Sequence, residues 1–158
     1  MKVSIIFGSQ SDKTVMKKAA DVLRDLQVEF NSKVVSAHRS PELLEKTIAD
    51  IEQDGTEVII AGAGLAAHLP GVIASKTLIP VIGVPLTSGA LNGIDALYSI
   101  VQMPKSVPVA TVGIDNAANA AYLAVEILGI KYPELKKKME ALRSKNQDDL
   151  TKDSVIDL

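Results

Sequence analysis

Cysteine is absent from the 158-residue sequence, and histidine occurs only twice. The lack of cysteine excludes disulfides and thiolate metal sites, and two histidines cannot by themselves form a typical zinc site. We therefore expect no metal cofactor.

Aromatic residues make up only 3% of the chain, and its charge is nearly balanced, with 17 basic and 19 acidic residues. Nucleic-acid binding depends on a strongly basic surface and often on aromatic rings that stack on bases. The sequence has neither feature, so we expect a small molecule rather than a nucleic acid as the ligand.

Long apolar runs are also missing. The chain passes from Met1 and Lys2 into VSIIFG, without the apolar core and cleavage site of a signal peptide. No stretch approaches the roughly 20 apolar residues that a membrane span needs. We therefore expect a cytoplasmic protein without a membrane partner.

Five short apolar segments rich in β-branched residues alternate with longer segments of helical period. This alternation is typical of an α/β domain in which helices cover both faces of a parallel sheet. The expected strands are residues 3–8, 30–36, 57–63, 80–86 and 108–114. The length suits a single domain over residues 1–158.

Crossover helices are expected after the first two strands, because apolar residues recur there at helical spacing. The predicted buried faces are Val15, Ala19, Val22, Leu23 and Leu26 in the first helix, and Leu43, Leu44, Thr47, Ile48 and Ile51 in the second.

The segment NAANAAYLAVEILG is predicted to form a helix with Asn116 as its N-cap and Gly129 at its end. It is apolar nearly all round and should be buried, and we expect a neighbouring subunit to contribute to that burial. A charged helix over residues 132–147 should follow. The remaining tail to residue 158 is expected either to fray or to dock on such a neighbour.

Four loops follow strands at the edge where open parallel sheets bind ligands, namely GSQSD, SAHRSPE, AGAGLAAHLPG and VPLTSGALNG. In the first loop, Ser9, Ser11 and Asp12 surround a predicted helix N-terminus, which suits an anion such as phosphate. Taken alone, simple capping by Ser11 or Asp12 is the better interpretation of this loop.

His38 and His68 lie in two of these loops, and each alone would be interpreted as an ordinary loop histidine. Arg39, next to His38, can bind phosphate or carboxylate through two parallel hydrogen bonds, and imidazole titrates near neutral pH. Together these residues indicate either an enzyme that transfers a proton on a phosphorylated small molecule or a protein that only binds such a molecule.

These loops, together with PVIGVP, GIDALYSIVQMP and PVATV, resemble the consecutive motifs of the class I N5-carboxyaminoimidazole ribonucleotide mutase family of bacterial purine biosynthesis. The resemblance covers residues 3–130, and its SAHR and AAHLPG motifs are the most specific. It implies a flavodoxin-like three-layer αβα sandwich with a central parallel five-stranded sheet, a homo-octamer, and an isomerisation that uses no metal or cofactor.

In the reaction that the resemblance implies, a carboxylate moves from N5 of a ribonucleotide substrate to C4 of its imidazole ring through trapped carbon dioxide, and His38 shuttles the proton. The resemblance assigns Ser9, Asp12 and Arg39 to substrate binding, with Ser11, Ser36 and Ala37 beside them. It places His68 in the carbon dioxide pocket with Ala63, Gly64 and Leu69.

Two alternatives stay open beside the mutase. One is the related class II activity, in which carbon dioxide carboxylates aminoimidazole ribonucleotide directly, although the loop AGAGLAAHLPG favours class I. The other is a nucleotide-binding module without catalysis.

Three residues depart from the family pattern. Leu65 stands where the family most often has a second glycine, Ala96 where it often has serine, and Ser106 where it normally has glycine. Leu65 is expected to matter most, because a bulky side chain in this loop would alter its closure or the pocket volume, and Ser106 is expected to need a changed turn.

Overall fold

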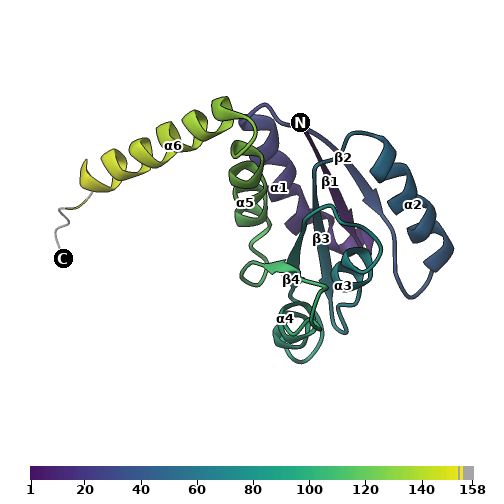
Figure 1. The fold of residues 1–158 in the computed structure, drawn as a ribbon. Coiled ribbons are helices and arrows are strands. Elements are labelled where there is room, and N and C mark those ends of the chain that lie inside the picture. Colours follow the sequence, from purple (N-terminus) through teal and green to yellow (C-terminus); the bar gives the residue numbers. More distant parts are fainter. Residues whose placement is uncertain (153, 155–158) are drawn as a thin grey trace.

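A five-stranded parallel sheet in the order β2-β1-β3-β4-β5 forms the middle layer of the fold (Figure 1). The computed structural model describes residues 1–152 and 154. The strands are β1 (Lys2–Phe7), β2 (Glu29–Val34), β3 (Val58–Gly64), β4 (Val81–Leu86) and β5 (Ala110–Thr111). The predicted α/β three-layer architecture is confirmed.

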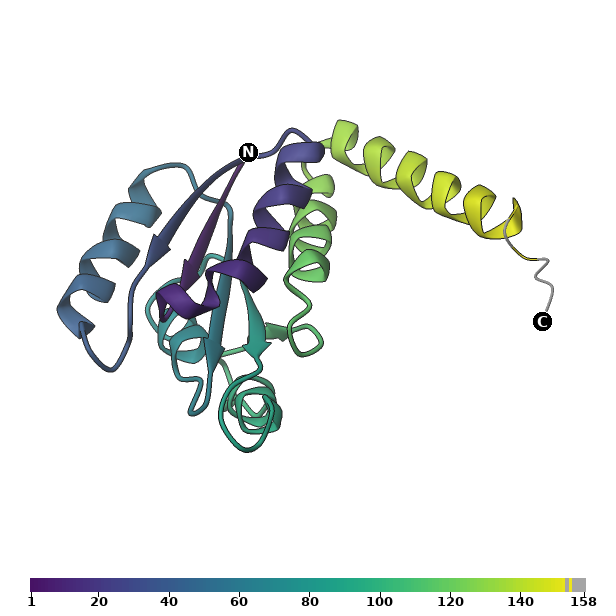
Figure 2. The ribbon, with the colours of Figure 1, turned by 180° about the vertical axis from the view of Figure 1, so that it is seen from behind.

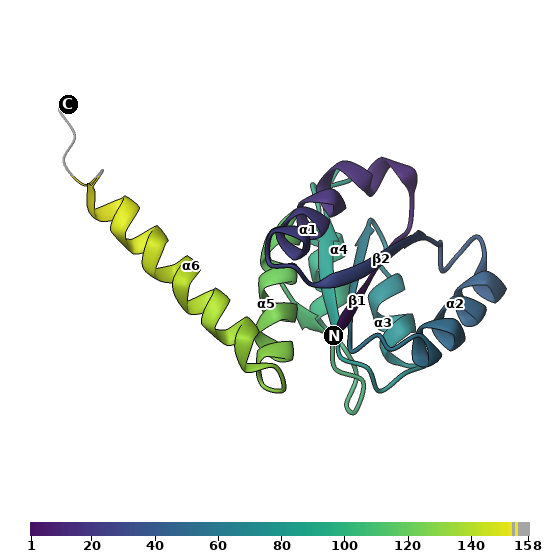
Figure 3. The same cartoon turned by 90° about the horizontal axis from the view of Figure 1, so that it is seen from above.

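Helices cover both faces of this sheet. They are α1 (Lys13–Asp25), α2 (Pro41–Gln53), α3 (Leu69–Ala74), α4 (Ile94–Val101), α5 (Ala117–Gly129) and α6 (Pro133–Lys152), and a short 3-10 turn, η1 (Gln10–Asp12), precedes α1. Helices α1 and α5 share one apolar core with the sheet, and α2, α3 and α4 share the other (Figure 3). None of the described helices is both long and apolar enough to cross a membrane.

The central strands are buried on both faces, which is why their sequences read as continuous apolar runs rather than as alternating patterns. The edge strands differ from this. Strand β2 is only half-buried, and β5 pairs over two residues instead of the predicted 108–114. Pro108 has no N–H for the ladder, and the chain turns at Asp115, where φ is +57°.

Two short helices, α3 and α4, were not predicted from hydrophobic periodicity. They have six and eight residues, fewer than the roughly 11–18 residues over which hydrophobic periodicity is read. In α2, the predicted buried face is correct except for Leu43, which is 50% exposed. The neighbouring Leu44 is buried, as predicted.

Six residues of helix α5 are buried within the single chain, but Ala118, Tyr122, Leu123 and Ile127 are only partly buried. The expected contribution of a neighbouring subunit to the burial of this helix stays a prediction. The helix lies between α1 and α6, and four alanines on its buried face allow close packing. The predicted N-cap is confirmed, because the side chain of Asn116 accepts a hydrogen bond from the backbone N–H of Asn119 at 3.2 Å.

Helix α6 runs to Lys152, beyond its predicted end at residue 147. Its first turns pack on α5 through Leu135 and Met139, and the rest extends away from the body of the domain (Figures 1 and 2). The tail up to Lys152 is therefore the exposed end of a helix, and residues 153 and 155–158 lie outside the described residues.

The fold shows the surroundings of two of the three departures from the family pattern. Ser106 has φ +72°, the left-handed region that favours glycine, so serine occupies a turn suited to glycine. Ala96 is fully buried on the inner face of α4.

The close packing of α4 on β4 depends on Gly83. A Cβ atom at this position would lie 2.3 Å from Cγ2 of Ile100 and 3.0 Å from Cγ1 of Val109. We expect Gly83→Ala to lower the free energy of unfolding by about 1–3 kcal/mol through overpacking, as measured by denaturant titration.

Gly113→Ala is the matched control, because the nearest atom to its added Cβ would be 3.8 Å away. Equal stabilities for the two variants would contradict the packing argument.

Candidate functional site

Three loops meet where β1, β2 and β3 end. Strand β1 lies between β2 and β3, so the loops that follow these strands are neighbours at one edge of the sheet. The chain leaves β1 toward one face and leaves β3 toward the other, which opens a crevice between them. A cavity of about 450 Å³ lies there, and roughly 300–1,000 Å³ is usual for small-molecule sites.

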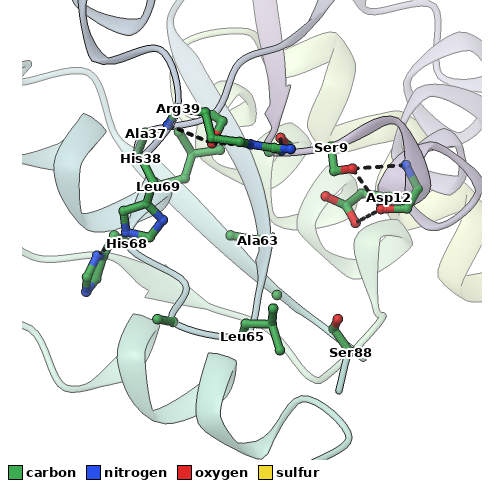
Figure 4. A pocket seen from close by; sticks show the side chains of 15 residues that line it. Ser9, Asp12, Ala37, His38, Arg39, Ala63, Leu65, His68, Leu69 and Ser88 are labelled. Atoms are coloured by element: carbon green, nitrogen blue, oxygen red, sulfur yellow. Dashed lines mark hydrogen bonds between the residues drawn. The ribbon is translucent and has the colours of Figure 1, made fainter.

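All residues singled out in the sequence line this one cavity. They are Ser9, Ser11, Asp12, Ser36, Ala37, His38, Arg39, Ala63, Gly64, His68 and Leu69. In Figure 4, Ser9 and Asp12 lie at one end of the cavity and the two histidines at the other. The polar groups of GSQSD therefore face the histidine loops across the crevice.

Ser9, rather than Ser11 or Asp12, provides the cap of the loop after β1. Its hydroxyl accepts hydrogen bonds from the N–H of Ser11 at 3.4 Å and from the Ser11 hydroxyl at 2.9 Å. Asp12 precedes α1 but makes no side-chain cap. Asp12 therefore does not act as a simple helix cap. The carboxylate of Asp12 lines the cavity instead.

Burial raises the pKa of Asp12 above its usual value. Hydrogen bonds from the Ser11 side chain and the Ser9 backbone, and the positive charge of Arg39, oppose this shift but do not cancel it. The carboxylate has thus lost part of its hydration. Hydroxyl groups of a ligand would replace that lost solvation.

Arg39 ties the loop after β2 to the loop after β1. Its Nη2 donates a hydrogen bond to the carbonyl of Gly8 at 2.8 Å, and its Nε donates to the hydroxyl of Ser36 at 3.2 Å. Among the described residues, no carboxylate forms an ion pair with its guanidinium. The side chain is therefore oriented by neutral groups and keeps its charge available for an anion.

The two histidines contact each other directly. Nε2 of His38 lies 2.6 Å from Nδ1 of His68, and the rings meet edge to face with centroids 4.7 Å apart. Such a contact requires a hydrogen on one of the two facing nitrogens and a lone pair on the other. The two facing nitrogens therefore cannot both carry a hydrogen in this contact.

The loop after β3 gives the cavity an apolar wall. Ala63 and Leu69 are buried at its base, and Leu65 is 52% exposed along its rim. A small apolar molecule could rest on this wall beside the histidines. Within the described part of the chain, no group of three or more His, Cys, Asp or Glu side chains could hold a metal ion.

Gly8, Leu65, Ala66 and Ser88 also line the cavity but were not among the predicted site residues. Ser88 comes from VPLTSGALNG, which the sequence places at the correct edge of the sheet without indicating which residue faces inward. The signal that could have identified Ser88 was the presence of a serine in a loop at that edge. Leu65 was noted only as a departure from a family pattern.

Known proteins resemble this chain along most of its length. The profile of the AIR carboxylase family matches residues 2–149. The N5-carboxyaminoimidazole ribonucleotide mutase of Pyrococcus abyssi is 63% identical over 142 residues, which cover 90% of this chain and 82% of that protein. The enzyme of the same name from Thermotoga maritima is 54% identical over 144 residues, covering 91% of this chain and 84% of that protein.

A solved structure agrees with this relationship. The crystal structure of Treponema denticola PurE superimposes with a TM-score of 0.83 at 28% sequence identity, covering 96% of this chain and 97% of that one. By its sequence and its fold, the chain belongs to the AIR carboxylase family.

Proposed function

We propose that this protein is an N5-carboxyaminoimidazole ribonucleotide mutase, which converts its substrate to 4-carboxy-5-aminoimidazole ribonucleotide in purine biosynthesis. The observation that carries the proposal is the histidine pair in the same cavity as Arg39 and Asp12. The two relatives compared above carry this name and support the choice of reaction.

The phosphoribosyl part of the substrate would occupy the end of the cavity formed by GSQSD and Arg39. The guanidinium of Arg39 supplies a fixed positive charge for phosphate. Asp12, with Ser9 and Ser11, supplies acceptors and donors for ribose hydroxyls, and Ser36 and Ala37 complete the wall beside Arg39. The imidazole ring then extends toward His38.

The reaction needs one proton to be moved and returned. When the N5–carboxylate bond breaks, carbon dioxide forms and N5 takes a proton from His38. C4 then attacks the carbon dioxide, the new carbon–carbon bond forms, and the C4 proton returns to His38. No net proton, electron or further reactant is consumed, so the residues of the cavity suffice.

His68 has two parts in this scheme. Its hydrogen bond to His38 orients the catalytic ring. Together with Ala63, Gly64 and Leu69, it also encloses the carbon dioxide between the two steps. On the side of Ala63 and Leu69, these buried apolar groups keep water away from the carbon dioxide.

Direct carboxylation of aminoimidazole ribonucleotide is the alternative reaction, because the name of the family, AIR carboxylase, refers to that activity. It would use the same proton transfer at C4 but would take carbon dioxide from solution. The high identity to relatives named as mutases favours the internal transfer.

Replacement of the proton carrier tests catalysis separately from binding. We expect His38→Asn to lower turnover of the N5-carboxylated ribonucleotide by about 10²–10⁴-fold, the usual contribution of a general acid–base residue. Affinity for the product should stay within a few-fold of wild type in calorimetry, because Arg39 and Asp12 are unchanged.

A His38→Asn variant with near-normal turnover would exclude His38 as the proton carrier. Wild-type protein that binds the ribonucleotide without converting it would instead support the non-catalytic module.

The phosphate contact gives a second prediction. We expect Arg39→Ala to weaken ribonucleotide binding by about 10- to 100-fold, since a hydrogen bond to a charged group contributes roughly 1.5–3 kcal/mol. The measurement is titration calorimetry with the product.

Arg24→Ala is the control, because this exposed arginine pairs with Asp21 on α1 and does not line the cavity. If Arg39→Ala and Arg24→Ala bound equally well, Arg39 would not be the anion ligand.

We further infer that the active form is a homo-octamer in the cytoplasm. Four large apolar side chains lie along α4 and the turn before it, and each is at least 45% exposed: Leu91, Ile94, Tyr98 and Val101. Tyr98 and Val101 lie four and seven residues after Ile94, so these three side chains share one face of α4. An exposed apolar face of this kind supports association with further copies of the chain.

Light scattering should therefore give a mass of about 134 kDa, eight times the 16.8 kDa chain. Tyr98→Glu should lower that mass, because it places a charge in the apolar face of α4. Leu78→Glu, at a fully exposed leucine elsewhere, should not. A single-chain mass for the wild type, or equal masses for wild type and Tyr98→Glu, would contradict the inference.

A further inference from the structure

The loop after β4 contributes one polar group to the cavity that the proposed reaction does not use. Ser88 lines the cavity and is half-buried there. Among the described residues, its hydroxyl makes no hydrogen bond, whereas the hydroxyls of Ser9, Ser11 and Ser36 on the other loops all do. The Ser88 hydroxyl is therefore available to a ligand.

The backbone that carries Ser88 is fixed by Asp115, in the turn before α5. The Asp115 carboxylate accepts a hydrogen bond from the N–H of Thr87 at 2.8 Å, and the Asp115 N–H donates to the carbonyl of Pro85 at 2.9 Å. Asp115 makes these bonds with φ at +57°, a region that is unfavourable for most residues but that aspartate tolerates. The start of the loop is thus held one residue before Ser88.

Two glycines let neighbouring segments pack closely on the same stretch. A Cβ atom at Gly93, just before α4, would lie 3.3 Å from Cα of Thr87. A Cβ atom at Gly64, at the end of β3, would lie 3.0 Å from Cβ of Ser88. The Ser88 side chain therefore has a defined position beside Gly64 in the cavity wall.

Ser88 faces the middle of the proposed substrate. Figure 4 shows Ser88 along one edge of the cavity and Arg39 along the opposite edge, with Ala63 between them. The proposed reaction assigns Arg39 and the GSQSD loop to the phosphoribosyl part, and the histidines with Ala63 and Gly64 to the carboxylate that moves. The aminoimidazole ring joins these two parts, and a ring that lies over Gly64 meets the Ser88 hydroxyl.

We propose that Ser88 is a further substrate-binding residue, which forms a hydrogen bond to the aminoimidazole ring and is positioned by Asp115. The inference rests on the proposed mutase function. The unsubstituted ring nitrogen accepts a hydrogen bond, and a hydroxyl donates one without adding charge. A neutral donor leaves the electrons of the ring available for the attack of C4 on carbon dioxide, whereas a cationic donor would withdraw them.

Two ligands that differ in the ring test this contact. The product, 4-carboxy-5-aminoimidazole ribonucleotide, carries the ring, and ribose 5-phosphate has only the phosphoribosyl part. We expect Ser88→Ala to weaken binding of the product about 3- to 10-fold, the usual contribution of a neutral hydrogen bond, and to leave binding of ribose 5-phosphate unchanged. Arg39→Ala should weaken both. The measurement is titration calorimetry, with ribose 5-phosphate measured by competition.

Ser75→Ala is the matched control. This serine is exposed at the end of α3, its hydroxyl donates to the carbonyl of Val72, and it does not line the cavity. The control should bind both ligands like the wild type. If Ser88→Ala binds the product like the wild type, or weakens both ligands equally, Ser88 does not contact the ring.

The positioning role of Asp115 is tested by non-additivity. Asp115→Gly removes the carboxylate and suits the positive φ, and Asp115→Asn keeps an oxygen that can accept from Thr87. We expect Asp115→Gly to weaken product binding by a factor similar to that of Ser88→Ala, and Asp115→Asn to bind like the wild type. The double variant Ser88→Ala with Asp115→Gly should bind no more weakly than Ser88→Ala alone.

Ser106→Gly is the control for the backbone change, because it also relieves a positive φ, at a position that does not line the cavity. It should leave the affinity for the product unchanged. Additive losses in the double variant would show that Asp115 does not act through Ser88 and would overturn its positioning role.

The outcomes distinguish this inference from the proposed function. A wild type that binds both ligands but forms no C4-carboxylated product would overturn the mutase proposal, while the comparison of the two ligands would still decide the role of Ser88. A wild type that converts the substrate, with unchanged affinity in Ser88→Ala, would overturn the ring contact and leave the mutase function standing.

Discussion

The whole site depends on β1 lying between β2 and β3 in a parallel sheet. This strand is almost completely buried, with Val3, Ile5 and Ile6 at most 1% exposed, and it pairs with β2 on one side and with β3 on the other. His38 follows β2 and His68 follows β3, so their contact spans the end of β1. Both faces of β1 pack into apolar cores, with Val3 and Ile5 on one face and Ile6 on the other, so the strand is held firmly between the two strands whose loops carry the histidines.

The same strand order separates the two ends of the cavity. The chain leaves β1 toward α1 on one face, whereas it leaves β2 and β3 toward α2 and α3 on the other. Asp12 therefore comes from one side of the crevice and the histidines from the other, while Arg39 bridges the loops after β1 and β2 by its bond to Gly8. One end can hold charged and hydroxyl groups while proton transfer takes place at the other. Two energetically unfavourable features lie in this crevice. They are the burial of the Asp12 carboxylate, which raises its pKa, and the positive φ of Leu65.

The sequence was sufficient to predict the fold class and the loops of the site, because apolar runs mark buried strands and parallel strands bring their carboxyl ends to one edge. The sequence was insufficient for features that are determined by tertiary contacts. Helices α3 and α4 are too short to show a period, and the burial of α5 depends on how α1 and α6 pack around it. The 2.6 Å contact between His38 and His68 joins residues 30 positions apart, and no local pattern encodes its distance. Ser88 could be placed at the correct edge, but only the structure shows that it lines the cavity.

The central claim is that the carboxylate moves from N5 to C4 within one cavity. The direct measurement supplies the N5-carboxylated ribonucleotide with carbon-13 in its carboxylate, in buffer that contains unlabelled bicarbonate, and follows the C4 carboxylate by NMR or mass spectrometry. The account predicts that most of the label is retained in the product. A product whose carboxylate matches the unlabelled bicarbonate pool would contradict it and would identify the protein as a carboxylase that takes carbon dioxide from solution.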